Sequence, residues 1–217
     1  MEIEKIIVHK DFCDERPLGH DIALLKLKEK VDLSRFTPAC LPPKNASYAG
    51  KTASVYGWGL TTDEAEDAEA EGCPTYETSP VLMETTQTIM TNNACETSSG
   101  TVQRCENGII TEVQATMVGA LTDNMVCGIG NRQSACFGDS GGPFTVEVGG
   151  QHILVGAVSW GLGCGRVSII AIDHELEIIC IKNTLQDGIP TVYSSVPAQR
   201  DWINTTIENN GGGNYCD

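Results

Sequence analysis

Basic side chains are scarce in this sequence. Lysine and arginine total 14 residues against 29 aspartates and glutamates, which gives a formal net charge of -15. Binding to nucleic acid or to an anionic membrane surface requires a basic patch, so the composition argues against both classes of partner. The acidic excess favours cationic partners at long range, and it equally serves simple solubility.

An export signal and a membrane span are also missing. The segment Met1–Val8 begins with acidic residues, no apolar run long enough for a signal peptide follows it, and no stretch is apolar enough to cross a bilayer. The 10 cysteines form no C-x-x-C pair, which argues against a zinc site and indicates disulfides formed in an oxidising compartment. Sequons at Asn45 and Asn204 fit secretion. A disulfide-rich chain without an export signal is contradictory, and the simplest interpretation is that the sequence begins late.

Short apolar runs between turn residues predict an all-β chain. A Gly-Gly pair at 149–150 supplies the positive φ that a tight hairpin needs. Pro197 predicts the start of a C-terminal helix, because proline is common in the first turn. The predicted strands are Ile3–Val8, Ile22–Leu27, Thr52–Trp58, Val81–Met90, Asn124–Cys127, Phe144–Val148, His152–Trp160 and Thr191–Val196.

Two segments differ from the rest of the chain. Residues 63–71 carry six acidic side chains in nine positions, which predicts a solvated loop, with an exosite for cations as the sharper alternative. Residues 167–186 are rich in isoleucine and separate two segments that would otherwise join smoothly. This insert begins Val-Ser and ends Gln, as translated splice-donor and acceptor sequences would. We interpret it as a retained intron, and the alternative is a genuine surface-loop insertion, which costs little stability.

The hexapeptide Gly138-Asp-Ser-Gly-Gly-Pro143 is the motif that carries chemistry. Its glycines allow a tight turn that exposes the hydroxyl of Ser140, and they bring backbone N–H groups together as an oxyanion hole requires. The shorter pattern G-x-S-x-G also occurs in α/β-hydrolases, whereas the full hexapeptide is more specific. Supporting motifs in chain order are Asp21-Ile-Ala-Leu-Leu-Lys-Leu, Pro38-Ala-Cys-Leu-Pro42, Gly57-Trp-Gly59, Val158-Ser-Trp-Gly161, Val192-Tyr193 and Asp201-Trp-Ile203.

In order and spacing, these motifs resemble the trypsin/chymotrypsin family of serine proteases from Met1 to about Asn204. The resemblance implies an all-β, chymotrypsin-like double β-barrel with a C-terminal helix, whose first barrel is incomplete here. A single peptidase domain would span residues 1–217. Its parts would be the remnant of the N-terminal barrel at 1–45, the C-terminal barrel at 46–196 with the insert at 167–186, and the helix and tail at 197–217.

The resemblance also assigns catalytic roles. Ser140 would be the nucleophile and Asp21 the buried carboxylate that orients a histidine. The N–H groups of Gly138 and Ser140 would form the oxyanion hole, and Asp139 would receive the new N-terminus on zymogen activation. The implied activity is endopeptidase cleavage through an acyl-enzyme at Ser140, without a metal or an organic cofactor.

A substrate cleft follows from the same resemblance. Ser159, Trp160 and Gly161 would lie on the strand that pairs with the substrate backbone, with Ser159 beside the triad aspartate. Ser134 would form the base of the specificity pocket and Thr191 a narrow wall. A neutral base would leave a basic side chain buried without a partner, so we expect cleavage after medium apolar or aromatic residues. The implied partners are protein or peptide substrates and protein inhibitors.

The catalytic histidine of the family has no counterpart before Asp21. His20 adjoins Asp21, and neighbouring side chains on a strand point to opposite faces. We interpret His9 as structural and His152 as a surface residue, and His174 lies in the insert. The missing histidine, mature N-terminus and export signal would all lie upstream, so one truncation accounts for all three absences. We therefore expect this chain to fold poorly and to be inactive.

Two other functions remain as alternatives. A non-catalytic homologue would bind partners through the same cleft, although it would not need to keep the aspartate and serine. An unrelated serine esterase would need an acid and a histidine after the serine, and no suitable pair is evident.

Cysteine pairings are also implied by the resemblance. Cys136 would pair with Cys164 beside the pocket, and Cys95 with Cys127. Cys40 would pair with an upstream segment and would therefore lack its partner here. The pairings of Cys13, Cys73, Cys105 and Cys216 stay open, and Cys180 belongs to the insert.

Overall fold

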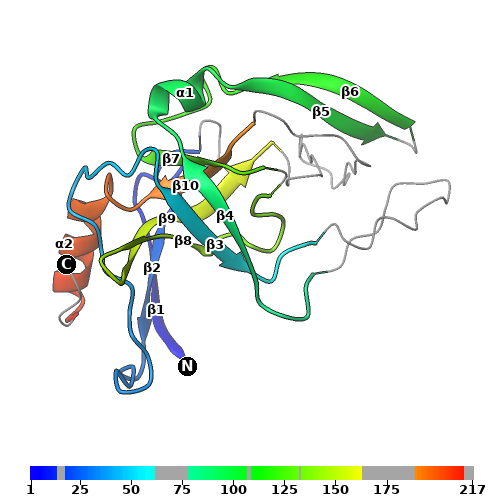
Figure 1. Cartoon of the computed structure of the whole chain (residues 1–217). Coiled ribbons are helices and arrows are strands. Elements are labelled where there is room, and N and C mark those ends of the chain that lie inside the picture. The colour runs from blue at the N-terminus through cyan, green and yellow to red at the C-terminus, as the bar shows by residue number, and fades with distance from the viewer. Residues whose placement is uncertain (14–17, 62–77, 107–108, 132, 163–188, 213–217) are drawn as a thin grey trace.

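A closed six-stranded barrel forms the centre of the computed structural model (Figure 1). The structure describes residues 1–13, 18–61, 78–106, 109–131, 133–162 and 189–212, with the backbone alone at 102–106 and 109–112. The barrel strands are β3 (Thr52–Gly57), β4 (Met83–Ile89), β7 (Met125–Ile129), β8 (Pro143–Val148), β9 (Gln151–Gly161) and β10 (Thr191–Ser195). Their order around the barrel is β10-β7-β4-β3-β8-β9, and all these pairings are antiparallel.

Alternation along the strands fills the barrel with apolar side chains. In β3 the inward residues Ala53 and Val55 are buried, while their neighbours are partly or fully exposed. The ring of Phe144 from β8 stacks on Tyr193 from β10, with ring centroids 3.9 Å apart and planes inclined by 7°. Because strand side chains alternate between two faces, this pattern fixes which residues face the core.

The β8–β9 hairpin forms as the Gly-Gly pair predicts. Gly149 and Gly150 have φ of 60° and 82°, and the strands continue directly into the pair Val148↔Gln151. Both φ values lie in the left-handed region that glycine adopts without a Cβ clash. The turn therefore fixes the register of the two strands that flank the candidate site.

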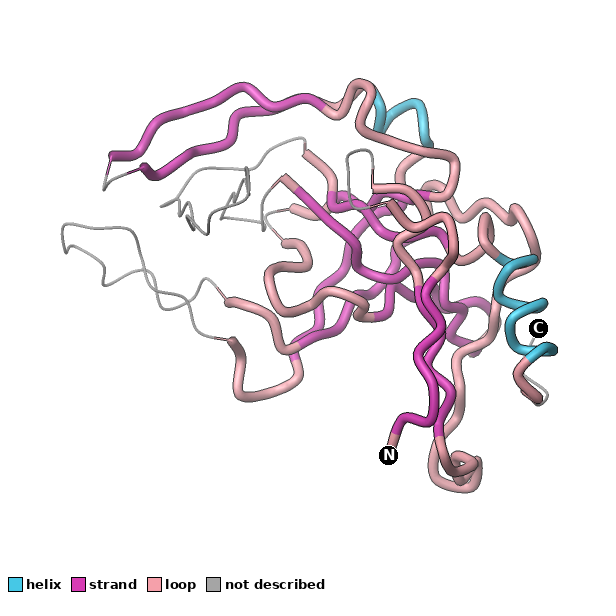
Figure 2. The backbone as a smooth tube through the Cα atoms, turned by 180° about the vertical axis from the view of Figure 1, so that it is seen from behind, coloured by secondary structure: helices cyan, strands magenta, loops and turns pink. Residues whose placement is uncertain are grey.

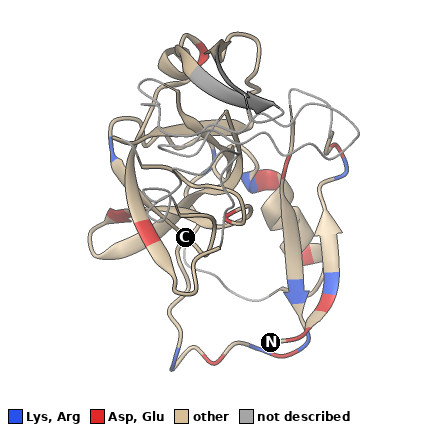
Figure 3. Cartoon of the chain, turned by 90° about the vertical axis from the view of Figure 1, so that its right-hand side faces the viewer, with Lys and Arg blue, Asp and Glu red and all other residues tan. Residues whose placement is uncertain are grey.

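A separate two-stranded sheet stands where the first barrel was expected. β1 (Ile3–Val8) pairs with β2 (Ala23–Leu27), and ion pairs link Glu4 to Lys26 and Glu2 to Lys28 across the sheet, where charges of both signs lie side by side (Figure 3). Ile6 and Leu25 lie opposite each other and are 61% and 55% exposed. Within the described residues this sheet has no further strand, and Ile3, Ile6, Val8 and Leu25 are exposed.

The C-terminal helix α2 (Arg200–Asn209) lies beside the β1–β2 sheet (Figures 1 and 2). Lys5 of β1 donates to the side chain of Asn210 at 2.9 Å, and the buried Arg200 donates from Nε to the carbonyl of Pro42 at 2.9 Å. The helix begins at Arg200 rather than at Pro197, because residues 196–199 first form a turn. The prediction of an all-β, chymotrypsin-like fold with a C-terminal helix is confirmed.

Each predicted strand is present, with both ends within two residues of the expected ones. The sequence interpretation missed helix α1 (Asn92–Glu96) and the hairpin of β5 (Ser99–Glu106) and β6 (Ile109–Thr116), which projects from the barrel (Figure 1). The sequence of this hairpin is mostly polar and has little apolar alternation. Its usable signal is the dipeptide Asn-Gly at 107–108, which is typical of tight hairpins. The acidic run at 63–71 and the insert at 167–186 lie outside the described residues.

Candidate active site

The loop at 138–143 leads into β8 and presents Ser140 at the surface. Gly138 and Gly141 have φ of 92° and 78°, so the turn on either side of the serine uses conformations that favour glycine. Within the described part of the chain, no hydrogen bond uses the N–H of Gly138 or Ser140. The loop therefore offers an exposed hydroxyl and two backbone donors.

The carboxylate of Asp139 turns inward, away from this surface. Its Oδ1 accepts from the N–H of Gly59 at 2.7 Å, and its Oδ2 accepts from the N–H of Cys136 at 2.8 Å. A Cβ at Gly57 would lie 1.8 Å from Oδ1 of Asp139, and one at Gly59 would lie 2.5 Å from Cγ. The motif Gly57-Trp-Gly59 therefore provides the space that the carboxylate occupies.

Two adjacent residues of β9 connect the serine loop to Asp21. The carbonyl of Val158 accepts from Gly141 at 2.8 Å, and its N–H donates to the carbonyl of Gly142 at 2.9 Å. The next residue, Ser159, donates from Oγ to Oδ2 of Asp21 at 2.6 Å. The structure thus brings Asp21, which lies just before β2, and the serine loop together on one short segment of β9.

The described histidines lie elsewhere. His20 stacks on His9, with ring centroids 4.3 Å apart and planes inclined by 12°, and His9 in turn contacts Trp202 of α2 at 4.7 Å. His20 has a φ of 55°, and its backbone N–H donates to Oδ1 of Asn124 at 3.1 Å. Among the described residues, no hydrogen bond joins a histidine to Asp21 or to the serine loop.

His9 is a buried, structural residue. Its Nδ1 accepts from the N–H of Asp11 at 3.1 Å, and the residue is 7% exposed. Burial lowers the pKa of His9, and repulsion from His20 lowers it further, while Asp11 acts in the opposite direction. His152 is exposed, as expected, and His174 lies outside the described residues.

The residues expected in the substrate cleft lie on neighbouring elements. Thr191 of β10 is 4% exposed and lies opposite Gly161 of β9, and Trp160 lies opposite Val192. Ser134 is half-buried, and its buried Oγ has no hydrogen-bond partner within the described residues.

Gln87 of β4 is a residue of this region that the sequence interpretation missed. It is 2% exposed and donates from Nε2 to Oγ1 of Thr191 at 3.2 Å and to the carbonyl of Gln133 at 3.1 Å. Its Oε1 accepts from the hydroxyl of Tyr193 at 2.5 Å. The alternation of β4 was the available signal, because Gln87 shares a face with the apolar Ile89, which the barrel buries.

Comparison with known proteins identifies the family. A family model described as Trypsin matches residues 1–176. The chain belongs to the trypsin family of serine proteases.

Three relatives of this trypsin-family chain carry the name Vitamin K-dependent protein C. The protein from Macaca mulatta is 32% identical over 173 residues, which cover 76% of this chain and 92% of the relative. The protein from Oryctolagus cuniculus is 28% identical over 216 residues, or 96% of this chain and 37% of the relative. The protein from Rattus norvegicus is 31% identical over 175 residues, which cover 77% of this chain and 32% of the relative. The chain thus spans about a third of the length of the rabbit and rat proteins.

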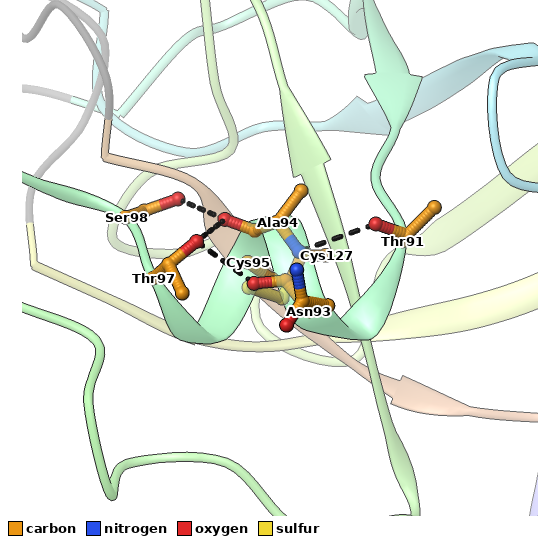
Figure 4. The surroundings of a disulfide bond; sticks show 7 residues. All are labelled: Thr91, Asn93, Ala94, Cys95, Thr97, Ser98 and Cys127. Atoms are coloured by element: carbon orange, nitrogen blue, oxygen red, sulfur yellow. Dashed lines mark hydrogen bonds between the residues drawn. A yellow bond between two sulfur atoms is a disulfide. The ribbon is translucent and has the colours of Figure 1, made fainter.

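Cys95 and Cys127 form a disulfide with a Cα–Cα distance of 6.2 Å, which is the pairing that the family resemblance implies. The disulfide joins α1 to β7 (Figure 4). Thr91 accepts from the N–H of Ala94 at the start of α1, and Thr97 donates to the carbonyl of Asn93 at its end. These bonds satisfy the ends of a five-residue helix that the disulfide ties to the barrel.

One expected pairing among the other cysteines of the trypsin-family chain was wrong. Cys40 was expected to lack its partner, but it is disulfide-bonded. The expectation assumed a partner upstream of the chain and overlooked the remaining cysteines within it. Cys136 is disulfide-bonded as well, and Cys164, its expected partner, lies outside the described residues. Cys13 is a free, exposed thiol.

A cavity of about 300 Å³ lies apart from the residues assigned to catalysis. Its lining includes Asn45, Tyr48, Asn92, Met125 and Ser195. Within the described residues, no three His, Cys, Asp or Glu side chains gather as metal ligands would. No described helix is both long enough and apolar enough to cross a membrane.

Proposed function

We propose that this chain carries the serine half of an endopeptidase site, in which Ser140 attacks the substrate carbonyl and forms an acyl-enzyme. One observation carries the proposal. Val158 holds the serine loop through two backbone hydrogen bonds, and the adjacent Ser159 binds Asp21 at 2.6 Å. This supports a nucleophile and an acidic partner that the same strand, β9, holds through hydrogen bonds.

The oxyanion of the tetrahedral intermediate would bind to the N–H groups of Gly138 and Ser140. Both donors are unused within the described residues, which supports this role. Asp139 would anchor the loop, because its carboxylate already accepts from Gly59 and Cys136. In the activated form its other partner would be a new N-terminus.

Ser134 and Thr191 would form the inner end of the specificity pocket. Their side chains are neutral, and a lysine or arginine bound there would lose its hydration without gaining a carboxylate. The enzyme would therefore cleave protein substrates after medium apolar or aromatic residues. Backbone groups of Ser159, Trp160 and Gly161 would pair with the substrate, and protein inhibitors would use the same cleft.

This chain by itself would have no measurable peptidase activity, because no described histidine bonds Asp21 or Ser140. A serine hydroxyl without an adjacent base is a weak nucleophile. The lack of such a base among the described residues also favours the second candidate function, a non-catalytic homologue that binds partners through the cleft.

The setting of the proposed function is extracellular. The disulfides of Cys95, Cys40 and Cys136 fit an oxidising compartment. The sequon residue Asn45 is exposed, which suits a glycoprotein. Residues 1–45 would be the remnant of the first barrel, 46–196 the second barrel and 197–217 the helix and tail of a peptidase domain made as a zymogen.

Imidazole rescue distinguishes the two functions. The refolded chain is treated with a fluorophosphonate probe and a chromogenic peptide ending in tyrosine, with and without free imidazole, which replaces the missing base. We expect labelling and slow hydrolysis only with imidazole, and neither in Ser140→Ala. A reaction that is equal in Ser140→Ala, or none under any condition, would contradict the serine mechanism and leave the binding function.

A further inference from the structure

Gln87 bonds three groups: two side chains of β10 and one carbonyl of the loop between β7 and β8. Nε2 uses both of its hydrogens, on Oγ1 of Thr191 at 3.2 Å and on the carbonyl of Gln133 at 3.1 Å. Oε1 accepts from the hydroxyl of Tyr193 at 2.5 Å. The amide is therefore fixed in orientation, because exchanging its oxygen and nitrogen would set Nε2 against a hydroxyl and Oε1 against a carbonyl.

Glycine makes room for this buried amide. A Cβ at Gly128 would lie 2.4 Å from Oε1 of Gln87 and 2.9 Å from Cζ of Phe144. A Cβ at Gly130 would lie 2.3 Å from the carbonyl oxygen of Gln133, which is one of the partners of the amide. Both positions thus exclude any larger residue while the glutamine and its partner remain in place.

The hydrogen-bond partners of Gln87 include, or directly precede in the chain, the residues assigned to the specificity pocket. Thr191 is one of them, and the carbonyl of Gln133 belongs to the peptide bond that continues into Ser134. Oγ of Ser134 is buried and has no hydrogen-bond partner within the described residues. A buried hydroxyl is normally bonded, so the hydroxyl of Ser134 has a donor and an acceptor left for a ligand or a water.

The direction of each hydrogen bond determines what this site offers. Thr191 accepts from Gln87, and its hydroxyl also hydrogen-bonds the hydroxyl of Tyr193. Tyr193 donates to Gln87, and burial raises the pKa of its hydroxyl, which keeps the proton in place. The side chains of this group are therefore neutral, and Ser134 carries the hydroxyl that remains to donate or accept within the described residues.

We propose that Gln87 is a positioning residue for substrate selection, which fixes Thr191 and the Gln133–Ser134 peptide so that the pocket favours a side chain ending in a neutral hydroxyl, as in tyrosine. This inference rests on the proposed function, because it takes Ser134 and Thr191 as the inner end of the pocket. A phenol hydroxyl would satisfy Ser134 by donating or accepting. A phenyl ring would leave it unpaired, and a cation would find no opposite charge.

Small side-chain mimics test the pocket on the chain itself. The 15N-labelled chain is titrated with p-cresol, toluene and benzamidine, which represent tyrosine, phenylalanine and a basic residue, and the Ser134 amide signal is followed. We expect p-cresol to bind about three- to tenfold more tightly than toluene, which is the range for one neutral hydrogen bond. We expect benzamidine to bind most weakly.

Variants then assign the preference to Gln87. Gln87→Leu removes its three bonds, so p-cresol should lose its advantage while toluene affinity stays unchanged. Gln87→Glu should strengthen benzamidine binding at neutral pH, an effect that a merely structural role would not produce. Thr85→Ala is the control, because Thr85 lies on the same strand and its hydroxyl, within the described residues, bonds the side chain of Gln133 alone, at 2.9 Å.

The outcomes separate the two proposals. If no mimic binds the wild-type chain at the Ser134 signal, the proposed pocket is wrong, and the role of Gln87 in it as well. If the mimics bind and a folded Gln87→Leu chain keeps the p-cresol to toluene ratio, the positioning role alone is wrong. If Gln87→Leu fails to fold, Thr191→Val removes the hydrogen bond between Gln87 and Thr191 with little change of shape. An unchanged p-cresol to toluene ratio in Thr191→Val would then show that the positioning role is wrong.

Discussion

At the scale of single residues, glycines decide where the charged and polar groups of the site can lie. Asp139 occupies the space beside Gly57 and Gly59 and accepts two backbone hydrogen bonds there. The motif Gly57-Trp-Gly59 is therefore a packing requirement of the serine loop, although the two segments are 80 positions apart in the chain. A half-buried carboxylate that lost these donors would destabilise the folded chain.

Gly59→Ala should lower the free energy of unfolding by about 1–3 kcal/mol, because its Cβ would lie 2.5 Å from Cγ of Asp139. Urea titration monitored by tryptophan fluorescence measures the change. Gly119→Ala is the control, since its Cβ would meet no atom within 4 Å and only its positive φ of 73° adds a cost. A Gly59→Ala chain no less stable than Gly119→Ala would contradict the close packing of Asp139.

At the scale of elements, the hairpin β5–β6 and helix α1 depend on the barrel through few connections. The chain leaves β4, forms α1 and the hairpin, and returns to β7. The disulfide between Cys95 and Cys127 closes this excursion with a sequence separation of 32 residues. Cys95 and Met117 are completely buried, so the excursion also packs onto the barrel through its base.

Removing this disulfide with Cys95→Ala and Cys127→Ala together should cost about 3–4 kcal/mol, the chain-entropy value for a loop of this size. Thermal unfolding of the oxidised chain and of the double variant measures the loss. Cys13→Ala serves as the control, because this thiol is free and exposed. A double variant as stable as Cys13→Ala would mean that the excursion is held by packing alone.

At the scale of the whole molecule, a stack of rings joins the β1–β2 sheet to the C-terminal helix. His9 and His20 lie face to face, and Trp202 of α2 contacts His9. The neighbouring ionisable groups are Lys10 and Asp11, and Asp11 lies within 4.0 Å of Nδ1. The contact holds the small sheet on the barrel domain, since most of the apolar face of that sheet is exposed.

The stability of this connection should depend on pH. The pKa of His9 is lowered from 6.5 by burial first and by His20 second, so the unfolded chain binds a proton more readily than the folded chain. Its contribution is therefore fully present above about pH 6.5 and is lost as the pH falls towards the pKa of the folded state, with a slope of at most about 1.4 kcal/mol per pH unit.

Urea titrations between pH 5 and 8 test this dependence. The variant His9→Gln should flatten the slope in this window, whereas His152→Gln should not, because His152 is exposed. If the free energy of unfolding changed with pH equally in the wild type and His9→Gln, His9 would not control the pH dependence of stability.

Much of the barrel could be predicted because the alternation of apolar residues and the turn residues are visible within each strand or hairpin. The alternation of Ala53 and Val55 and the Gly-Gly pair at 149–150 are local signals, and both appear in the structure as expected. The β5–β6 hairpin was missed because its strands are polar and packing at their base, rather than periodicity, holds them. Cys40 was misjudged because pairing depends on which cysteines the fold brings together, and spacing does not reveal that.

The sequence by itself determined the class of the protein, its barrel strands and the identity of Ser140 as the residue of the chemical motif, because these rest on local composition and contiguous motifs. Only the tertiary structure decided that Asp21 and the serine loop meet on Val158 and Ser159 and that Gln87 joins Thr191 to the peptide before Ser134. Such contacts join residues far apart in the chain, and they exist only once the closed barrel has set the register of its strands.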